Sequence, residues 1–234
     1  MLSLIQDPSI STAAMLQTIA AMLLVLGAGM TVHEFAHCLI ADRMGDDTPR
    51  RMGRLTLNPL VHINWVGWLM FALIGFGILG SAPINARRMH HPRWGFLAAV
   101  AAGPLANLAL ALFFALVAGF LGAANLYALP QIARAVILMM VYWNLLLAVF
   151  NLLPLYPLDG WQIVLAALPP ASAYEWQKHA QTSQYVFFGL IILSFMLPNF
   201  NLLGALIGEP VDWLARNLLG RENYLLFFFT LSGR

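Results

Sequence analysis

The chain has 234 residues, of which 61% are hydrophobic and only 9% are charged. A soluble domain typically carries about 25% charged residues, so the composition excludes a soluble globular protein and indicates an integral membrane protein. The formal net charge of +2 is small, and no basic tract or aromatic platform indicates a nucleic acid partner. A single cysteine, Cys38, excludes a disulfide within the chain.

Four segments are apolar and long enough to span a bilayer, which takes about 20 residues of helix. They are about 12–40, 95–122, 134–155 and 184–208. A fifth apolar stretch, about 61–82, is interrupted by four glycines. We therefore expect an all-α polytopic membrane protein that forms one domain over residues 1–234.

Two shorter segments lie outside these spans. Between the first span and the fifth stretch, Leu55-Thr56-Leu57 is bounded by Gly53 and Asn58-Pro59 and could form a short strand near 53–58. After the fourth span come an amphipathic piece at 210–217 and a short apolar tail at 224–229. This tail is too short to span the membrane, so we expect it at the interface or against the bundle.

The first span contains His33-Glu34-Phe35-Ala36-His37. On a helix the two histidines are one turn apart on the same face, so both imidazoles can reach one metal ion, and Glu34 can act on a water that the metal binds. Glu34 is the only charged residue between Ser9 and Ala41. Ionisable residues at membrane depth usually have a function. The motif predicts a hydrolytic zinc site; the alternative is a helix whose histidines only hydrogen-bond to neighbouring helices.

A catalytic zinc needs a third protein ligand and one open position. Between Thr48 and Tyr174 the chain has one acidic residue, Asp159. Asp159 is therefore the leading candidate for the third ligand, and His62 is a rival that we rank lower.

The surroundings of Asp159 fit a ligand position. Pro154 and Pro157 should end the preceding helix, which leaves Asp159 on irregular backbone before a new helix over 161–168. Asp is also a common helix N-cap, and both roles remain open for Asp159 at this point.

Three motifs in this order resemble the site-2 protease family of intramembrane zinc metalloproteases. They are His33-Glu34-Phe35-Ala36-His37, Gly103-Pro104-Leu105-Ala106-Asn107 and Asn151-Leu152-Leu153-Pro154-Leu155-Tyr156-Pro157-Leu158-Asp159-Gly160. The stretch 53–63 resembles the compact bacterial branch of that family, which has no accessory domains. The resemblance covers about 25–165, and 184–234 adds a further helix and a tail.

The resemblance implies one catalytic zinc ion held by His33, His37 and Asp159, with Glu34 as the general base. It also implies that Asn151 holds the substrate backbone or the oxyanion. Asn107 and His62 are weaker candidates for this substrate role, and for Asn107 a purely structural hydrogen bond is an equal alternative.

The implied substrate is a membrane-anchored protein, cut in regulated intramembrane proteolysis at the bacterial inner membrane. Two departures from the family pattern, at 64–65 and 81–85, concern the substrate loop and leave the proposed ligands untouched.

The ligand set makes a prediction about topology. His33 and His37 lie late in the first span and Asp159 follows the third, so they meet near one membrane face only if 61–82 is re-entrant. Seven arginines then share that face, with Arg134 on the other: Arg43, Arg50, Arg51, Arg54, Arg87, Arg88 and Arg93. Because arginine-rich loops are usually cytoplasmic, we expect the zinc nearer the cytoplasmic side.

Two other functions fit parts of the pattern. A metal-ion transporter also places His and Asp inside helices, but it would be expected to carry a relay of ligands, often in repeated halves. A non-cleaving pseudoprotease could bind membrane clients without hydrolysing them. This sequence has no second half that mirrors the first, which disfavours the transporter. A pseudoprotease would not explain why the complete set of catalytic residues is present.

Overall fold

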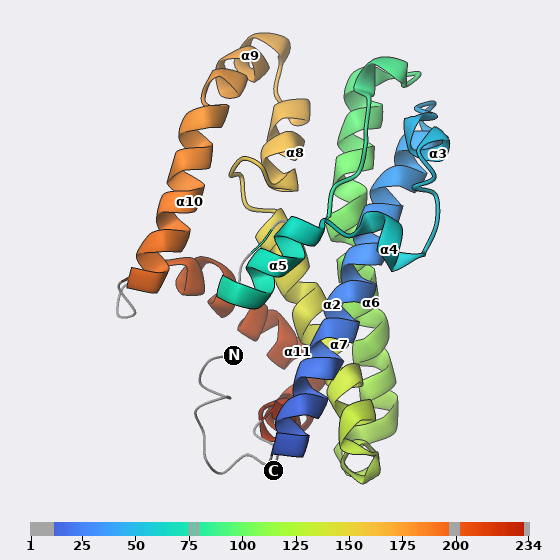
Figure 1. Cartoon of the computed structure of the whole chain (residues 1–234), viewed down its shortest axis with the longest axis vertical. Helices are drawn as coiled ribbons and strands as arrows, with labels where there is room; N and C mark the ends of the chain where they lie inside the picture. Colours follow the sequence, from blue (N-terminus) through green and yellow to red (C-terminus); the bar gives the residue numbers. More distant parts are fainter. Residues whose placement is uncertain (1–11, 75–76, 78–79, 197–201, 232–234) are drawn as a thin grey trace.

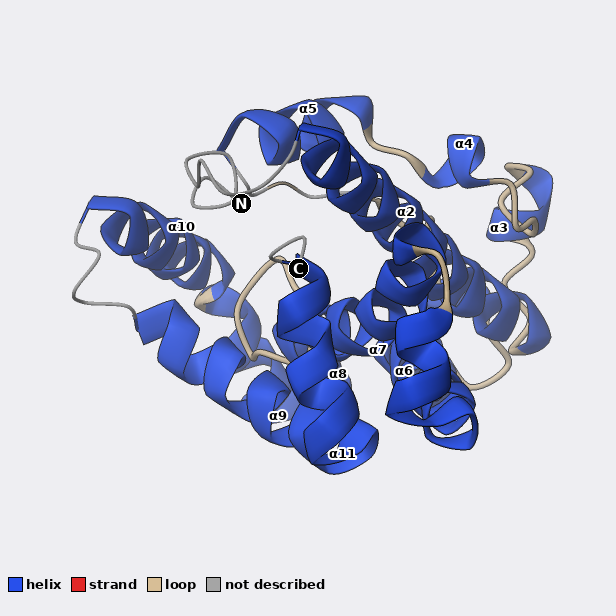
Figure 2. Ribbon diagram, turned by 90° about the horizontal axis from the view of Figure 1, so that it is seen from below, coloured by secondary structure: helices blue, strands red, loops and turns tan. Residues whose placement is uncertain are grey.

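The structure is a computed structural model that describes residues 12–74, 77, 80–196 and 202–231. Every regular element in this part of the chain is a helix (Figure 2). Three long helices form the central bundle: α2 (Thr12–Arg43), α6 (Pro92–Ala128) and α7 (Gln131–Asn151) (Figure 1). All three are long and apolar enough to cross a membrane. The prediction of an all-α integral membrane protein agrees with this architecture.

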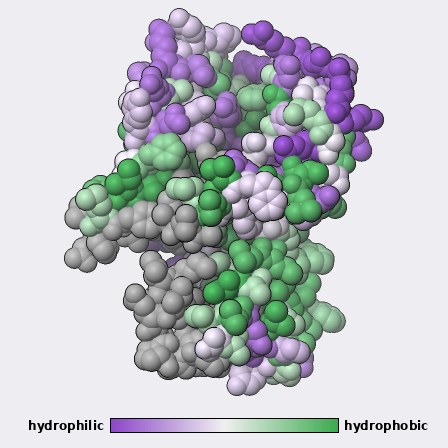
Figure 3. All heavy atoms as spheres, in the orientation of Figure 1, coloured by the Kyte–Doolittle hydropathy of each residue, from purple (hydrophilic) through white to green (hydrophobic). Residues whose placement is uncertain are grey.

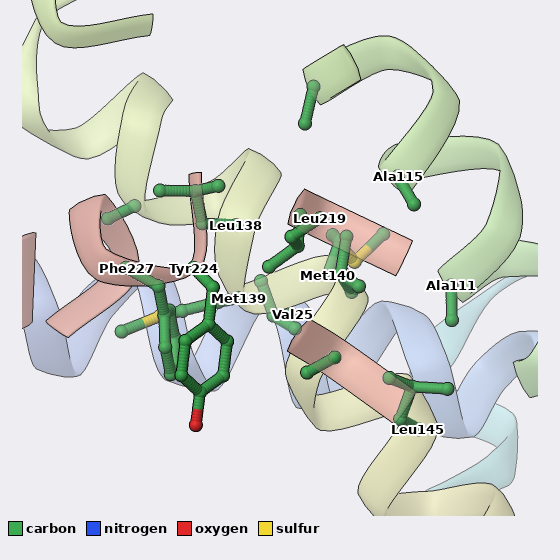
Figure 4. Packing of buried hydrophobic residues seen from close by; sticks show 14 of the residues in the cluster. Val25, Ala111, Ala115, Leu138, Met139, Met140, Leu145, Leu219, Tyr224 and Phe227 are labelled. Carbon is green, nitrogen blue, oxygen red and sulfur yellow. The ribbon is translucent and has the colours of Figure 1, made fainter. Parts of the chain in front are cut away.

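The bundle packs closely because α6 presents small residues to its neighbours. Its buried positions recur mostly every four residues, and most of them hold glycine or alanine: Gly95, Ala99, Gly103, Ala111, Ala115 and Ala118. Small side chains let membrane helices approach each other closely. The gaps are filled by larger side chains of α2 and α7, among them Val25, Leu138 and Leu145 (Figure 4).

The C-terminal segment is α11 (Glu209–Leu231), a kinked helix of two pieces, which follows a π-helical turn, η2 (Gly204–Gly208). Its backbone leaves the helical conformation at Gly220, where φ is +72°. The predicted amphipathic piece and apolar tail both belong to this helix, on either side of Gly220. Leu219 and Phe227 contribute to the same core as α2, α6 and α7, so the tail packs on the bundle (Figure 4).

The prediction of a fourth span over 184–208 is not confirmed. In its place α10 (Ala180–Met196) has 17 residues, and residues 197–201 lie outside the described part of the chain. At 1.5 Å per residue α10 rises about 25 Å, which is short of a hydrocarbon core of about 30 Å. It runs beside the bundle and is joined to it through two short helices, α8 (Asp159–Ala167) and α9 (Pro170–Lys178) (Figure 1).

The predicted strand near 53–58 is wrong. The stretch is a loop between α3 (Thr48–Arg51) and α4 (Pro59–His62), because local hydrogen bonds hold it in turns. Asn58 N donates to Thr56 Oγ1 over 3.1 Å, and Asn58 Oδ1 accepts from Leu60 N at the start of α4. A strand needs a partner strand, and the described residues contain none.

Residues 61–82 contain α5 (Trp65–Ile74), a helix of ten residues, which rises only about 15 Å. The chain then returns to the end of α2 from which it left. Asn85 N donates to Asp46 Oδ2 over 2.6 Å, and His90 N donates to Met44 O over 2.8 Å. The re-entrant path stays a prediction, and residues 75–76 and 78–79 within it lie outside the described residues.

Hydrophilic residues gather at the end of the molecule that carries α3 and α9, above an apolar flank (Figure 3). Ion pairs link arginines to aspartates there: Arg50 to Asp42, and both Arg51 and Arg88 to Asp47, each over 2.6 Å. Both α2 and α7 run toward this end (Figure 1). The ends of the two helices that lead to the predicted ligands therefore lie on the same side of the bundle.

Candidate metal centre

His33, His37 and Asp159 meet between α2 and α8. The Nε2 atoms of the two histidines are 3.0 Å apart, and Asp159 Oδ2 lies 3.1 Å from His33 Nε2 and 3.3 Å from His37 Nε2. All three side chains can offer one ligand atom to a common metal ion. The structure thus brings together the three residues that the sequence predicts as ligands.

Hydrogen bonds fix which nitrogen of each histidine is free for a metal. His33 Nδ1 lies 2.6 Å from Asn107 Oδ1, and His37 Nδ1 lies 2.8 Å from Ala99 O. Both partners are oxygen acceptors, so both rings carry their proton on Nδ1 and leave a lone pair on Nε2. Two such nitrogens and a carboxylate oxygen facing one another repel unless a cation lies between them. This donor set fits zinc.

The Asp159 carboxylate is the charged ligand of the group. Asp159 is the first residue of α8, and the N-cap is Leu158. The N-cap alternative is therefore wrong for Asp159, and its side chain points to the imidazoles.

The position of α8 follows from contacts at both of its ends. At the N-terminus, a Cβ on Gly160 would overlap the carbonyl oxygens of Leu152 and Leu153, so glycine lets α8 pack on the end of α7. At the C-terminus, Arg93 of α6 donates from Nε to Ala166 O over 2.8 Å and from Nη2 to Ala167 O over 2.7 Å. These contacts hold Asp159 in place against α2.

Gly103 lets α6 pass directly against the two histidine rings. A Cβ at this position would overlap His37 Nε2 and lie 2.7 Å from His33 Cε1. Any larger residue would displace one or both imidazoles. Gly103 thus serves both close helix packing and the space that the ligand set needs.

Glu34 lies beside the three ligands, 4% exposed. Its Oε2 atom is buried without a hydrogen-bond partner among the described residues. A cavity of about 420 Å³ opens in front of it, and the wall includes Glu34, Asn151, Gln162 and the segment 80–82. Gly80 approaches so closely that a Cβ there would lie 2.6 Å from Glu34 Oε1. A buried carboxylate without a partner, beside a metal site, can accept a proton.

The remaining predicted site residues differ in position. Asn151 lines the cavity and donates from Nδ2 to Leu147 O over 2.9 Å. Asn107 is fully buried behind His33, bonded to its Nδ1. His62 lies outside the ligand group, with Nε2 bonded to Thr56 O over 2.8 Å. The ligand group is therefore complete without His62, and the substrate roles of Asn107 and His62 stay predictions.

Two residues at or near the site were missed from the sequence. Gln162, one turn after Asp159 on α8, lines the cavity. Asn144 is fully buried on α7 and contacts Asn107. Asn144 could have been noticed as a polar residue in the middle of an apolar helix.

A membrane bundle that brings two histidines, an aspartate and a buried glutamate together could hold a metal ion, and such an arrangement is typical of metal-dependent hydrolases. Comparison with known proteins agrees. The chain is 34% identical over 212 residues, 88% of its length, to a Bacillus subtilis (strain 168) protein named "Putative zinc metalloprotease YwhC", of which the match covers 90%. It belongs to the zinc metalloprotease family of that relative.

More distant relatives carry similar names. A Mycobacterium tuberculosis (H37Rv) zinc metalloprotease named Rip2 is 32% identical over 74% of this chain and 65% of its own length. A second zinc metalloprotease of that organism, Rip3, is 29% identical over 68% of this chain, but the match covers 32% of Rip3. No protein-family model matches the chain, and no solved structure matches it either.

Proposed function

We propose that this chain is an intramembrane zinc endopeptidase of the site-2 protease type, which hydrolyses peptide bonds of membrane-anchored proteins. The observation that carries the proposal is the convergence of two Nε2 lone pairs and the Asp159 carboxylate beside the unpartnered Glu34 Oε2. His33, Glu34 and His37 lie on α2, a helix that is apolar and long enough to span a membrane.

The chemistry divides between the ion and the chain. His33, His37 and Asp159 would hold one zinc ion, which would supply Lewis-acid chemistry by polarising the scissile carbonyl and making water at the site more acidic. Glu34 accepts a proton from the attacking water while the water oxygen adds to the carbonyl carbon. The C–N bond then breaks, and Glu34 returns the proton to the leaving amine.

Asn151 is our candidate for holding the substrate at the cavity wall. Its side-chain amide has two N–H donors, and the bond to Leu147 O uses one of them. The second N–H can donate to the substrate backbone or to the oxyanion that develops during hydrolysis. Removing such a donor typically lowers the rate by about 100- to 1,000-fold.

The membrane setting is part of the proposal. The short α5 and the return of the chain to Met44 and Asp46 support a re-entrant path for 61–82. Irregular backbone at membrane depth is tolerated where it is buried in protein or lines a wet cavity. With the arginine-rich end cytoplasmic, the site lies nearer that face of a bacterial inner membrane, and regulated proteolysis of membrane-held proteins is the function that we propose.

A cleavage assay with three variants tests this function. Purified chain is incubated with a single-pass model substrate in detergent, and zinc per chain is measured on the same samples. We expect Glu34→Gln to abolish cleavage while retaining one zinc, because Glu34 is not a ligand. Asp159→Asn should lose both cleavage and zinc.

Glu175→Gln is the matched control, because Glu175 is a solvent-exposed partner of Lys178 on α9. It should cleave and bind zinc like the wild type. Cleavage by Glu34→Gln at the wild-type rate would refute the proposed role of Glu34. A wild type that transports metal but does not cleave would favour the transporter, although the described residues contain one ligand group and no relay.

A further inference from the structure

Two asparagines lie behind the metal site, on the side of His33 away from the cavity. Asn107 of α6 and Asn144 of α7 are both fully buried. They are joined by a hydrogen bond from Asn107 Nδ2 to Asn144 Oδ1 over 2.8 Å, and Asn107 Oδ1 lies 2.6 Å from His33 Nδ1. Buried amides in an apolar bundle are costly unless they are fully paired, so this chain of contacts calls for a role.

Backbone carbonyls fix the direction of the chain. Asn144 Nδ2 donates to Met140 O over 2.9 Å, and Asn107 Nδ2 also donates to Gly29 O over 3.1 Å. A carbonyl oxygen can only accept, so each asparagine must direct its amino group toward that carbonyl. Each amide oxygen is therefore left to accept: Asn144 Oδ1 from Asn107, and Asn107 Oδ1 from the Nδ1–H of His33.

We infer that Asn107 and Asn144 are positioning residues that set the tautomer and the ring orientation of His33, and that metal affinity at the site therefore depends on Asn144. The inference rests on the proposed zinc site and deepens it. Asn144 is two hydrogen bonds away from the ligand atom His33 Nε2. Partners of metal-ligating histidines typically change metal affinity about 10- to 100-fold when they are removed.

The two histidines differ in how they are held. His37 Nδ1 bonds to the backbone oxygen of Ala99, which no side-chain substitution removes. His33 depends on side chains from two other helices. Side chains of α6 and α7 can therefore change the metal affinity of the site through the orientation of the His33 ring.

Gly29 provides independent support, because it makes the room that Asn144 occupies. It lies one turn before His33 on α2, and a Cβ there would lie 2.9 Å from Asn144 Oδ1 and 3.1 Å from Leu147 Cδ1. Gly29→Ala therefore displaces the Asn144 amide while it removes no hydrogen-bonding group. This substitution therefore perturbs the contact between Asn144 and Asn107 without changing either asparagine.

The test measures zinc affinity by chelator competition, together with the visible absorption of the Co²⁺-loaded protein. Asn107→Leu should weaken zinc binding about 10- to 100-fold, and Asn144→Leu about 10-fold, each with a changed Co²⁺ spectrum. Leu keeps the branched shape of asparagine, with a somewhat larger volume, and removes its amide. The matched control is Asn223→Leu, since Asn223 of α11 is also buried and donates to Ala118 O over 3.3 Å.

Asn223→Leu should leave both zinc affinity and spectrum unchanged. A double-mutant cycle keeps the test sharp if Asn144→Leu does not fold. Gly29→Ala should weaken zinc binding in the wild type and have little further effect in Asn144→Ala, because the side chain that it displaces is then absent.

Wild-type affinity and spectrum in Asn144→Leu, or equal effects of Gly29→Ala with and without the Asn144 amide, would overturn the inference. A wild type that binds no zinc would instead overturn the proposed function. The two failures are therefore distinguishable.

Discussion

At the scale of single residues, the site depends on small side chains as much as on ligands. Three glycines lie so close to polar side chains of the site that a Cβ on any of them would come too near its neighbour. They are Gly103, Gly29 and Gly80. The partners are respectively the two histidines, Asn144 and Glu34. Close helix contact and a buried polar site are therefore built by the same glycines.

Gly103→Ala should reduce bound zinc strongly, because the added methyl group overlaps His37 Nε2 and crowds His33. The matched control is Gly119→Ala on the same helix, where a Cβ meets nothing within 4 Å. Alanine at position 119 should leave zinc binding intact and add to stability by about 0.5–1 kcal/mol. The measurement is the amount of zinc per chain in the two purified variants. Full zinc occupancy in Gly103→Ala would contradict the proposed role of Gly103.

At the scale of elements, the short helix α8 delivers Asp159 and is held to α6 through Arg93. Arg93→Ala frees the last carbonyls of α8, so we expect a lower melting temperature and several-fold weaker zinc binding. Arg87→Ala is the control, because the exposed Arg87 makes no side-chain hydrogen bond in the described part of the chain. Equal zinc affinity in Arg93→Ala and Arg87→Ala would show that this clamp does not position Asp159.

The long elements could be predicted from the sequence, and the tertiary details could not. Uninterrupted apolar runs predict α2, α6 and α7 to within a few residues at most ends, and helical spacing predicts that His33 and His37 share a face. The strand predicted near 53–58 is wrong because alternating residues in a sequence do not show whether a partner strand is present. The contact of Asn107 with His33 depends on the register of α6 against α2, which no local pattern encodes.

At the scale of the whole molecule, charge and topology agree. The arginine-aspartate pairs lie at the end where α2 finishes, while Arg134 lies near the start of α7, where it donates to Tyr127 O over 3.0 Å. Because arginine-rich loops favour the cytoplasm, the two ends should face opposite sides of the membrane.

Cysteine labelling tests this orientation, since the only cysteine, Cys38, is buried and can be replaced by alanine. In that background, Asn125→Cys should react with an impermeant maleimide added outside intact cells, and Arg88→Cys should react only after the membrane is opened. Both residues are exposed. External labelling of Arg88→Cys would contradict the predicted orientation and the re-entrant path.

The central claim is that the chain cuts peptide bonds in the membrane with one zinc ion and Glu34. The most direct measurement is cleavage of a single-pass substrate by the purified chain in proteoliposomes, before zinc removal, after it, and after one equivalent of zinc is restored. We predict that cleavage within the apolar segment is lost on removal and regained on restoration, and that zinc-loaded Glu34→Gln does not cleave. Cleavage that persists without zinc, or that Glu34→Gln retains, would contradict the account.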